Sequence, residues 1–469
     1  MARNVYLSEP GVICCAGANA EEFFDSLVNG DQSFILKVKC ALDEYSPAAD
    51  GTADSATAGM GTDGTARDTD SAASQSSAVS ATQSADSSSS AAAREFYAGR
   101  ISDEKLNRLA DSSSSAVLPF ARDGLLDERV ARIMDCALSQ IAGAAKKAAR
   151  LYGKSRIAVC VGSCDNGSSL SLKAHRALFS KGAFPSDYNI KMQGADFPAV
   201  YASRKFGLEE SGSIVLAFAT ACSSSASAII KASQLIQSGL ADAVIAGGVD
   251  IASDTVLLGF GSLEAISAEK TNPFSANRSG ITLGEGAAFF VLAKDDLDSA
   301  GIILAGTGES SDAHHMTAPL EDGSGAARAM KNALSDARVQ PEQIDYINLH
   351  GTGTRLNDAA EAKAVSAVFG SQSAPFVSST KPVTGHTLGA AGALELAACF
   401  LAIKNQRLPV HVWDGIKDSA LPELNFVSKA AKSDRIGGTD EKAIRCCMSN
   451  SFAFGGCNTV LIIRQVDSK

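Results

Sequence analysis

The chain has 469 residues, of which 45% are hydrophobic, and its formal net charge is −10 at pH 7. A chain of this length can bury a large core, and length alone suggests about three domains of roughly 150 residues each. The acidic balance, without any block of Lys and Arg interleaved with aromatic residues, excludes general nucleic-acid binding. To bind an acidic partner, this chain would therefore need a local patch of basic residues on its surface.

The eleven cysteines are scattered singles and two adjacent pairs. Because there is no CxxC spacing and no pair of histidines at zinc-finger spacing, we expect a reduced, cytoplasmic protein. The apolar run at 12–18 lacks the basic region that opens a signal peptide. We take 287–293 as the longest later apolar stretch, far below the roughly 20 residues of a membrane helix, and expect no membrane contact.

Residues 46–93 consist mainly of Ser, Ala, Asp, Thr and Gly, with almost no large apolar side chains. Such a segment buries too little surface to offset the entropy lost on ordering, which predicts a disordered surface insertion. A carrier-docking or regulatory arm is the alternative.

Most of the remaining chain alternates between apolar, β-branched runs and helix-like segments. The runs at 157–161, 213–217 and 243–246 each lead into a turn that bears Gly, Ser or Cys. This alternation predicts an α/β fold with mainly buried sheets.

The sequence also shows a weak internal duplication. In one part the segment 217–222 leads from a strand into a helix at 225–237, and in the other the segment 376–380 leads through Gly385 and His386 into a helix at 390–403. The runs at 287–292 and 459–463 read as equivalent closing strands. Two similar halves, 1–300 and 301–469, therefore replace the three domains suggested by length.

Cys222, in the segment 220–225, comes directly after a strand and stands where a helix is expected to begin. Unpaired N–H groups and the positive end of the helix dipole favour an anion there, which predicts a stabilised thiolate and a nucleophile. An inert buried thiol is the alternative, since ten other cysteines are present.

Two histidines lie in Gly-rich turns, His350 in NLHGTGT and His386 in KPVTGHT. Glycine lets the backbone approach a ligand closely, and a neutral imidazole can donate to a developing oxyanion. A histidine in such a turn can also be purely structural, but two of them with a Cys and a Lys favour catalysis. The segment 450–458 reads as a flexible, aromatic-bearing loop, and no phosphate-binding loop or Rossmann fingerprint is present.

Four motifs in order, TACSSS, HGTGTRLNDAAE, KPVTGHTLGAAGALE and NSFAFGGCN, resemble those of the elongating beta-ketoacyl-[acyl-carrier-protein] synthases of the thiolase superfamily. The resemblance covers nearly the whole chain outside the low-complexity segment. It implies a duplicated, five-layered α-β-α-β-α fold and a homodimer, with a heterodimer as an alternative. It further implies decarboxylative condensation of an acyl group with malonyl-acyl carrier protein, in fatty-acid or polyketide-type elongation.

The resemblance also implies a role for each motif residue. Cys222 accepts the acyl group, and the backbone N–H groups of Cys222 and Phe454 form its oxyanion hole. His350 and His386 bind the malonyl thioester carbonyl, and Lys381 supports them. The remaining implied positions serve in a polar network (Asp358, Glu361), in pantetheine binding (Thr352, Thr354), as a gate (Phe454), and in a structural Na⁺ or K⁺ site found in some relatives (Asn348, Glu395, Ser449, Asn450).

No catalytic metal or resident cofactor is implied, because the substrates arrive on the phosphopantetheine of the carrier. Three positions depart from the family pattern. Glu264 stands where many elongators carry a carrier-docking Arg, 272–278 lacks the usual acidic residues, and Cys457 replaces a usual Thr. Asp165 and Asn166 are polar in a turn that reaches the acyl pocket of relatives. Unless Asp165 points away, this favours short, unsaturated or polar acyl groups.

Three alternatives stay open. A thiolase would share the fold and nucleophile but use a second catalytic Cys in a C-terminal Gly-rich loop, where Cys457 lies. A non-catalytic partner subunit resembling a chain-length factor would lack the nucleophile that Cys222 provides. A ketosynthase of a specialised polyketide or aryl-polyene pathway would perform the same chemistry on other chains.

Overall fold

A computed structural model describes residues 4–40, 94–112, 128–164, 167–370, 374–428 and 443–466. The described residues before position 41 and after position 94 belong to one compact unit. The insertion predicted at 46–93 lies outside the described residues, as do Asp165 and Asn166. The predictions for these segments therefore remain predictions.

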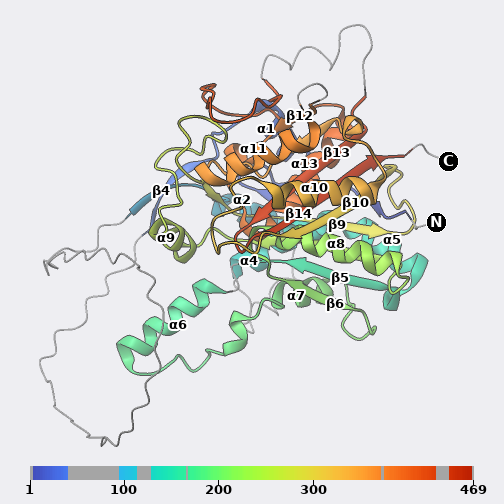
Figure 1. The fold of residues 1–469 in the computed structure, drawn as a ribbon. Coiled ribbons are helices and arrows are strands. Elements are labelled where there is room, and N and C mark those ends of the chain that lie inside the picture. The colour runs from blue at the N-terminus through green and yellow to red at the C-terminus, as the bar shows by residue number, and fades with distance from the viewer. Residues whose placement is uncertain are drawn as a thin grey trace, which may run out of the picture. The chain divides into compact units, whose positions relative to one another are not determined.

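The described strands form a mixed sheet in the order β12-β11-β13-β14-β10-β1-β9-β7-β5-β6, with β2 also paired to β9 (Figure 1). A small sheet has the order β3-β4-β8. The strand bounds are β1 Tyr6–Leu7, β2 Gly11–Cys14, β3 Leu36–Cys40, β4 Arg94–Gly99, β5 Ile157–Gly162, β6 Val215–Phe218, β7 Ala243–Asp250, β8 Leu283–Gly284, β9 Gly286–Ala293, β10 Ile302–Ser311, β11 Tyr346–Asn348, β12 Phe376–Ser378, β13 Cys446–Ala453 and β14 Cys457–Gln465.

The two ends of this sheet repeat one topology. In the first half β5 pairs in parallel with β6 and β7, and β9 closes β7 in antiparallel fashion. In the second half β11 pairs in parallel with β12 and β13, and β14 closes β13. The predicted closing strands are thus equivalent, and β1 joins the halves by pairing with both β9 and β10. The boundary at residue 300 itself stays a prediction.

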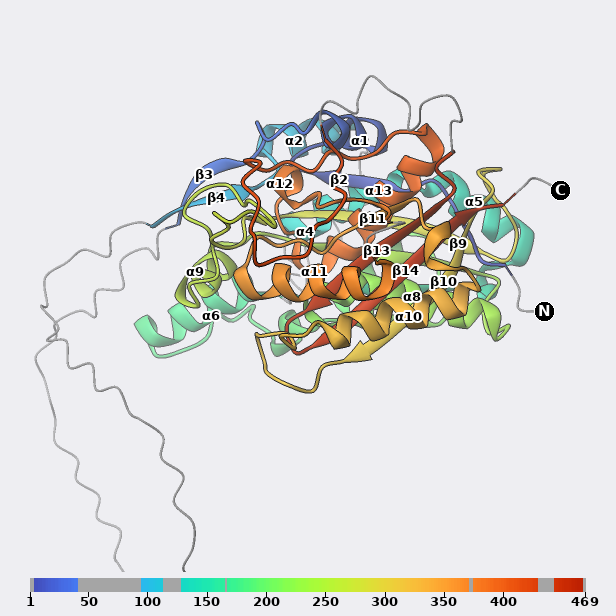
Figure 2. The same cartoon turned by 45° about the horizontal axis from the view of Figure 1, so that its top comes forward.

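The helices complete five layers. Their bounds are α1 Ala20–Asn29, α2 Asp103–Ser112, α4 Glu128–Gln140, α5 Ala142–Tyr152, α6 Ser168–Lys181, α7 Phe197–Lys205, α8 Ser224–Gln237, α9 Asp254–Ser262, α10 Ser324–Ala337, α11 Arg355–Phe369, α12 Lys381–Thr384 and α13 Ala391–Asn405. Helices α4, α5 and α7 cover the outer face of the first half, and α10 and α11 cover that of the second (Figure 2). Helices α8 and α13 pack together between the halves.

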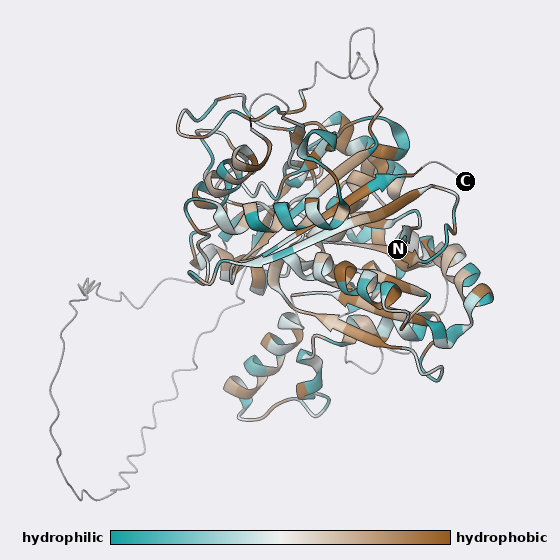
Figure 3. Ribbon diagram, turned by 45° about the vertical axis from the view of Figure 1, so that its right-hand side comes forward, coloured by the Kyte–Doolittle hydropathy of each residue, from teal (hydrophilic) through white to brown (hydrophobic). Residues whose placement is uncertain are grey.

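Side-chain alternation along the strands explains these layers. Successive residues of a strand point to opposite faces of the sheet. In β9, Phe289 and Val291 pack into the outer core with α4, whereas Phe290 and Leu292 pack into the central core with α8 and α13. A strand buried on both faces must be apolar throughout, and the closing strands are accordingly coloured as hydrophobic over most of their length (Figure 3).

The prediction of the longest apolar stretch was wrong. Leu388–Asn405 comprises 18 residues with a mean hydropathy of 1.3, which is long and apolar enough to cross a membrane by composition alone. In the fold, 89% of this window is buried inside the protein. The apolar character of the segment is thus explained by its place in the central layer, where α13 is covered on every side.

Candidate active site

Cys222 lies where the first half passes from strand to central helix. Strand β6 ends at Phe218, a single 3₁₀ turn covers Ala221–Ser223, and α8 begins at Ser224. Ala221 has a φ of 50°, a left-handed conformation that non-glycine residues rarely adopt. The turn is held by hydrogen bonds from the Thr220 N–H to Ser224 Oγ (2.9 Å) and from Ser223 Oγ to the Thr220 carbonyl (2.8 Å). The predicted strand-to-helix setting is therefore correct.

The expected resting thiolate is wrong. Burial raises the pKa of the Cys222 thiol to about 11, although the nearby Lys381 charge and a hydrogen bond from the Phe454 N–H act in the opposite direction. Desolvation of a thiolate outweighs these two stabilising contributions because the side chain is almost completely removed from water. Cys222 is thus a thiol that must lose its proton during the reaction.

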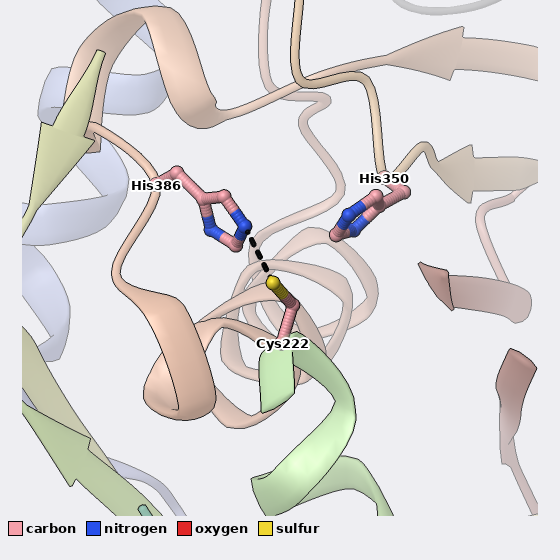
Figure 4. A group of neighbouring side chains, drawn as sticks. All are labelled: Cys222, His350 and His386. Atoms are coloured by element: carbon pink, nitrogen blue, oxygen red, sulfur yellow. Dashed lines mark hydrogen bonds between the residues drawn. The ribbon is translucent and has the colours of Figure 1, made fainter. Parts of the chain in front are cut away.

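The two motif histidines flank this thiol (Figure 4). His386 Nε2 lies 3.0 Å from Cys222 Sγ, and the rings of His350 and His386 meet edge to face with centroids 5.4 Å apart. One donor atom from each of the three residues lies within 4.8 Å of the others. Residues from β6–α8, β11 and the α12 turn therefore converge on one point.

Backbone hydrogen bonds fix the His386 turn. The His386 N–H donates to the Thr282 carbonyl (2.7 Å), and the Gly284 N–H donates to the His386 carbonyl (2.9 Å). Gly385 has a φ of 69°, and a Cβ there would lie 2.6 Å from the Leu283 carbonyl oxygen. The Gly before His386 is thus required by the close approach to β8.

Glu361 and Lys381 orient His350 from behind. Glu361 accepts from the backbone N–H groups of His350 and Gly351, each at 2.8 Å. Lys381 Nζ lies 3.4 Å from His350 Nδ1, donates to the His350 carbonyl and forms an ion pair with Glu395. With an ammonium donor facing Nδ1, the ring proton belongs on Nε2, the atom away from Lys381.

Burial sets the charges around these histidines. The pKa values of His350 and His386 lie well below the usual range, first because of burial and then because of the Lys381 charge. Both rings are therefore neutral at pH 7. Burial also raises the pKa of Asp358 to about 7 and that of Glu395 to about 7, and the pKa of Glu361 rises for the same reason.

Asp358 serves the turn after His350. Its carboxylate accepts from the Gly353 N–H (3.1 Å) and from the Phe274 N–H (2.7 Å), so it ties the 350–354 turn to the segment at 272–278. Asp358 and Glu361 thus contact backbone groups, as the positional role implied by the resemblance requires.

A narrow cavity opens over the thiol. Thr352 and Thr354 line it, with their hydroxyls 3.2 Å apart, and Phe454 lines it as well. The sequence reading missed five further lining residues, which are Phe260, Ala265, Ile281, Asn357 and Phe452. Because these five residues are spread over helices, strands and loops, no pattern in the sequence marked them as part of a site. Cys457 and the exposed Glu264 are not among the lining residues.

The segment predicted as a flexible loop at 450–458 is mostly strand. Residues up to Ala453 belong to β13, β14 begins at Cys457, and only the tight turn between them is irregular. Phe454 occupies this turn, where its ring stacks on Phe260 with centroids 5.9 Å apart. Glycines at 455 and 456, both with positive φ, make the reversal possible.

The four residues proposed as cation ligands share one feature. Asn348 Oδ1, Glu395 Oε2, Ser449 Oγ and Asn450 Oδ1 are all buried without a hydrogen-bond partner in the described part of the chain. A buried polar atom without a partner costs about 1–3 kcal/mol. Oxygen atoms of this kind are ligands for a monovalent cation, and the set fits one.

The layered fold and the Cys–His–His cluster define a condensing enzyme of the thiolase-like class. The profile described as "Beta-ketoacyl synthase, N-terminal domain" matches residues 127–297, and "Beta-ketoacyl synthase, C-terminal domain" matches 302–412. The chain belongs to the beta-ketoacyl synthase family and is an enzyme of acyl transfer. The α/β, thiolase-like fold predicted from the sequence is confirmed.

Curated relatives agree with this family. The chain is 36% identical over 325 residues to "3-oxoacyl-[acyl-carrier-protein] synthase 2" of Coxiella burnetii, covering 66% of this chain and 76% of the relative. It is 35% identical over 321 residues to "Nodulation protein E" of Rhizobium meliloti, with coverage of 66% and 76%. The solved ketosynthase ApeO, in complex with its chain length factor ApeC from Xenorhabdus doucetiae, matches at 30% identity with a TM-score of 0.75, covering 99% of this chain and 98% of that one.

The buried thiol predicts how Cys222 reacts with a small electrophile. Since the thiolate fraction grows tenfold per pH unit below the pKa, the rate of alkylation by iodoacetamide should rise about tenfold per unit from pH 7 to 10 without levelling off. The measurement is mass spectrometry of the Cys222 peptide, with Cys222→Ala as control. A plateau by pH 8 would contradict a thiol pKa of about 11.

Proposed function

We propose that Cys222, His350 and His386 carry out decarboxylative condensation between an acyl group on Cys222 and a malonyl group on acyl carrier protein. One observation carries the proposal, namely the 3.0 Å contact between Cys222 Sγ and His386 Nε2 beside a second neutral imidazole. The substrates arrive as phosphopantetheine thioesters, and the product is a beta-ketoacyl carrier protein and carbon dioxide. Neutral imidazoles suit this chemistry, because one can accept the thiol proton and both can donate to an enolate oxygen.

In the first step Cys222 Sγ attacks the acyl thioester. The thiol proton passes to His386 Nε2 and from there to the departing pantetheine sulfur, so the step is balanced in protons. The backbone N–H groups of Cys222 and Phe454 take the oxyanion. The Phe454 N–H already points at Cys222 Sγ, which supports its part in this role.

In the second step malonyl carrier protein loses carbon dioxide. The carbon–carbon bond breaks, and its electrons move to the thioester oxygen as an enolate. His350 donates to this oxygen through Nε2, the atom that Lys381 leaves protonated. His386 Nδ1 has no hydrogen-bond partner among the described residues, so nothing there fixes one tautomer, and Nε2 can donate once Cys222 carries an acyl group.

In the third step the enolate carbon attacks the acyl-Cys222 carbonyl. A carbon–carbon bond forms and the bond from the carbonyl carbon to Cys222 Sγ breaks, again with the oxyanion bound by the two N–H groups. The departing thiolate takes up a proton from solvent and returns to the resting thiol. We propose that Thr352 and Thr354 bind the pantetheine arm, because both line the cavity. Phe454 acts as the gate between the acyl and malonyl sides. Among the described residues, the only aromatic ring that stacks on it is that of Phe260.

The two half-reactions separate these roles. Cys222→Ala should abolish acyl transfer, whereas Cys222→Gln should still release carbon dioxide from malonyl carrier protein. Adding His350→Ala or His386→Ala to Cys222→Gln should lower that release by about 100- to 1,000-fold, since each removes a donor to the enolate. The measurement is carbon dioxide release. In a chain that keeps Cys222, His350→Ala and His386→Ala should lower the rate of Cys222 acylation by a smaller factor.

His175→Ala, on α6 outside the cavity, is the matched control for removing a histidine. Normal carbon dioxide release with poor acylation in the two motif variants would reverse the assignment.

We propose that the chain works in the cytoplasm as a dimer with acyl carrier protein as its partner. Strand β6 ends the large sheet, so one of its edges has no strand partner among the described residues, and its four residues are half-buried. Helix α6 and the segment after it also carry exposed apolar side chains, Phe179, Phe184 and Ile190. Open edges and apolar patches favour pairing with a second chain.

The dimer prediction is tested by sedimentation equilibrium of the purified chain. The expected mass is twice 48.2 kDa. Phe179→Ser should shift the equilibrium toward the monomer because Phe179 is 70% exposed in the single chain. A wild-type chain that sediments as a monomer at micromolar concentration would contradict the homodimer and favour a heterotypic partner.

We propose that Asn348, Glu395, Ser449 and Asn450 bind a Na⁺ or K⁺ ion that has a structural role. Unpartnered buried oxygens support this, and the ion would complete their coordination. At a potassium concentration ten times Kd, binding should stabilise the fold by about 1.4 kcal/mol over choline chloride at equal ionic strength. Thermal unfolding in the two salts measures this stabilisation. Ser449→Ala should reduce the difference in stability between potassium and choline chloride.

Ser233→Ala, a buried serine of α8 outside the set, is the control and should keep the difference between the two salts. Identical unfolding of the wild type in potassium, sodium and choline chloride would exclude the ion.

A further inference from the structure

The start of α13 repeats the geometry around Cys222 without its nucleophile. Each central helix comes directly after a 3₁₀ turn, Ala221–Ser223 before α8 and Leu388–Ala390 before α13. The first residue of each turn has a left-handed φ, 50° at Ala221 and 53° at Leu388. The second residue is Cys222 in one half and Gly389 in the other. Gly389 is therefore the structural counterpart of the nucleophile.

A buried carboxylate occupies the space beside Gly389. Asp250, the last residue of β7, is 1% exposed, and its Oδ2 accepts from the Gly389 N–H at 2.6 Å. A Cβ on residue 389 would lie 2.6 Å from the same oxygen. The carboxylate thus fills the place that a side chain on residue 389 would take. In this half, an internal anion replaces the nucleophile at the helix start.

The same carboxylate binds the turn after β5. Asp250 Oδ1 accepts from Ser163 Oγ at 2.8 Å, and the Cys164 N–H donates to both oxygens at 3.0 and 3.1 Å. Asp250 therefore connects two segments that are distant in sequence, the turn at 162–164 and the turn at 388–390, just after His386. Because Asp250 also acts on Cys222 by raising its pKa, its charge reaches the nucleophile as well.

We propose that Asp250 is a positioning residue, whose carboxylate fixes the His386 turn against the turn after β5 and whose negative charge lowers the reactivity of the resting Cys222. The proposal rests on the proposed function, since His386 is the group that is positioned. It explains why the second half has a glycine at the counterpart of Cys222. It also explains how a cysteine at a helix start remains protonated. The negative charge of Asp250 and burial both oppose the stabilisation of a thiolate by the helix N-terminus.

Two measurements separate a positioning role from a purely structural one. In Asp250→Asn, one carboxylate oxygen becomes an NH₂ group, which cannot accept from Gly389 or Cys164, and the negative charge is lost. Alkylation of Cys222 by iodoacetamide at pH 8 should become at least about fivefold faster, because the opposing charge is gone. Asp250→Glu keeps the charge and should retain the slow wild-type rate.

The second measurement is carbon dioxide release from malonyl carrier protein in the Cys222→Gln background. Adding Asp250→Asn should lower kcat at least about tenfold with KM unchanged, because His386 is displaced from the enolate oxygen. Asp135→Asn is the matched control, since Asp135 is equally buried but pairs with Lys205 and Tyr201 on the outer layer. It should leave both measurements within about twofold of its parent.

The outcomes distinguish this proposal from the reaction that it builds on. No carbon dioxide release by Cys222→Gln with Asp250 intact would overturn the proposed function, while the alkylation test of Asp250 would still stand. Unchanged alkylation in Asp250→Asn would overturn the proposal, and so would equal effects in Asp135→Asn. Circular dichroism of each variant confirms that a folded chain is compared.

Discussion

The buried ion pair between Lys381 and Glu395 is the interaction on which the arrangement of the site depends. Lys381 is 1% exposed, and its ammonium group contacts Glu395, the His350 carbonyl and the side of the His350 ring that bears Nδ1. Removing one partner of such a pair costs about 3–5 kcal/mol, because the other charge stays buried. The pair therefore links α12, α13 and the turn after β11, which come from separate parts of the second half.

The same pair controls the chemistry of both histidines. Burial lowers the pKa values of His350 and His386, and the positive charge of Lys381 lowers them further, so both rings remain neutral. Neutral rings can donate to an enolate oxygen without holding it as a tight ion pair. The positive charge also offsets part of the desolvation of Cys222. Lys381 thus acts on all three side chains of the cluster, although it is not among the residues that line the cavity.

Close packing of small residues brings the nucleophile and the histidines together. A Cβ on Gly392 of α13 would lie 2.8 Å from the Ala226 Cβ of α8, and one on Gly162 would lie 2.3 Å from the Ser225 backbone nitrogen. The central helices and the end of β5 therefore approach with almost no side chain between them. Such contacts leave the helix starts little freedom, so the separation of Cys222 from His386 is set by the backbone.

The sequence was sufficient for the motif residues and for many of the elements, although it missed the end of β13, and it was insufficient for the balance of forces among them. Alternating apolar runs predicted β5, β7, β9 and β14 because burial on both faces requires them, and the Gly-rich turns predicted the histidines. The state of Cys222 could not be predicted, since it depends on burial by residues far away in sequence. Phe260 and Phe452 reach the cavity only through the fold, and an aspartate at a strand end gave no sign of its partner, Gly389.

The duplication gives these facts a common physical explanation. Two equivalent helix starts meet in the central layer, and each can bind an anion. At the start of α13, the Gly389 N–H binds the carboxylate of Asp250 from the first half, while the turns of the second half bring His350, His386 and Lys381 to the region of Cys222. In the proposed reaction, one half therefore carries the acyl group, and the other supplies the hydrogen-bond donors that act on the incoming thioester.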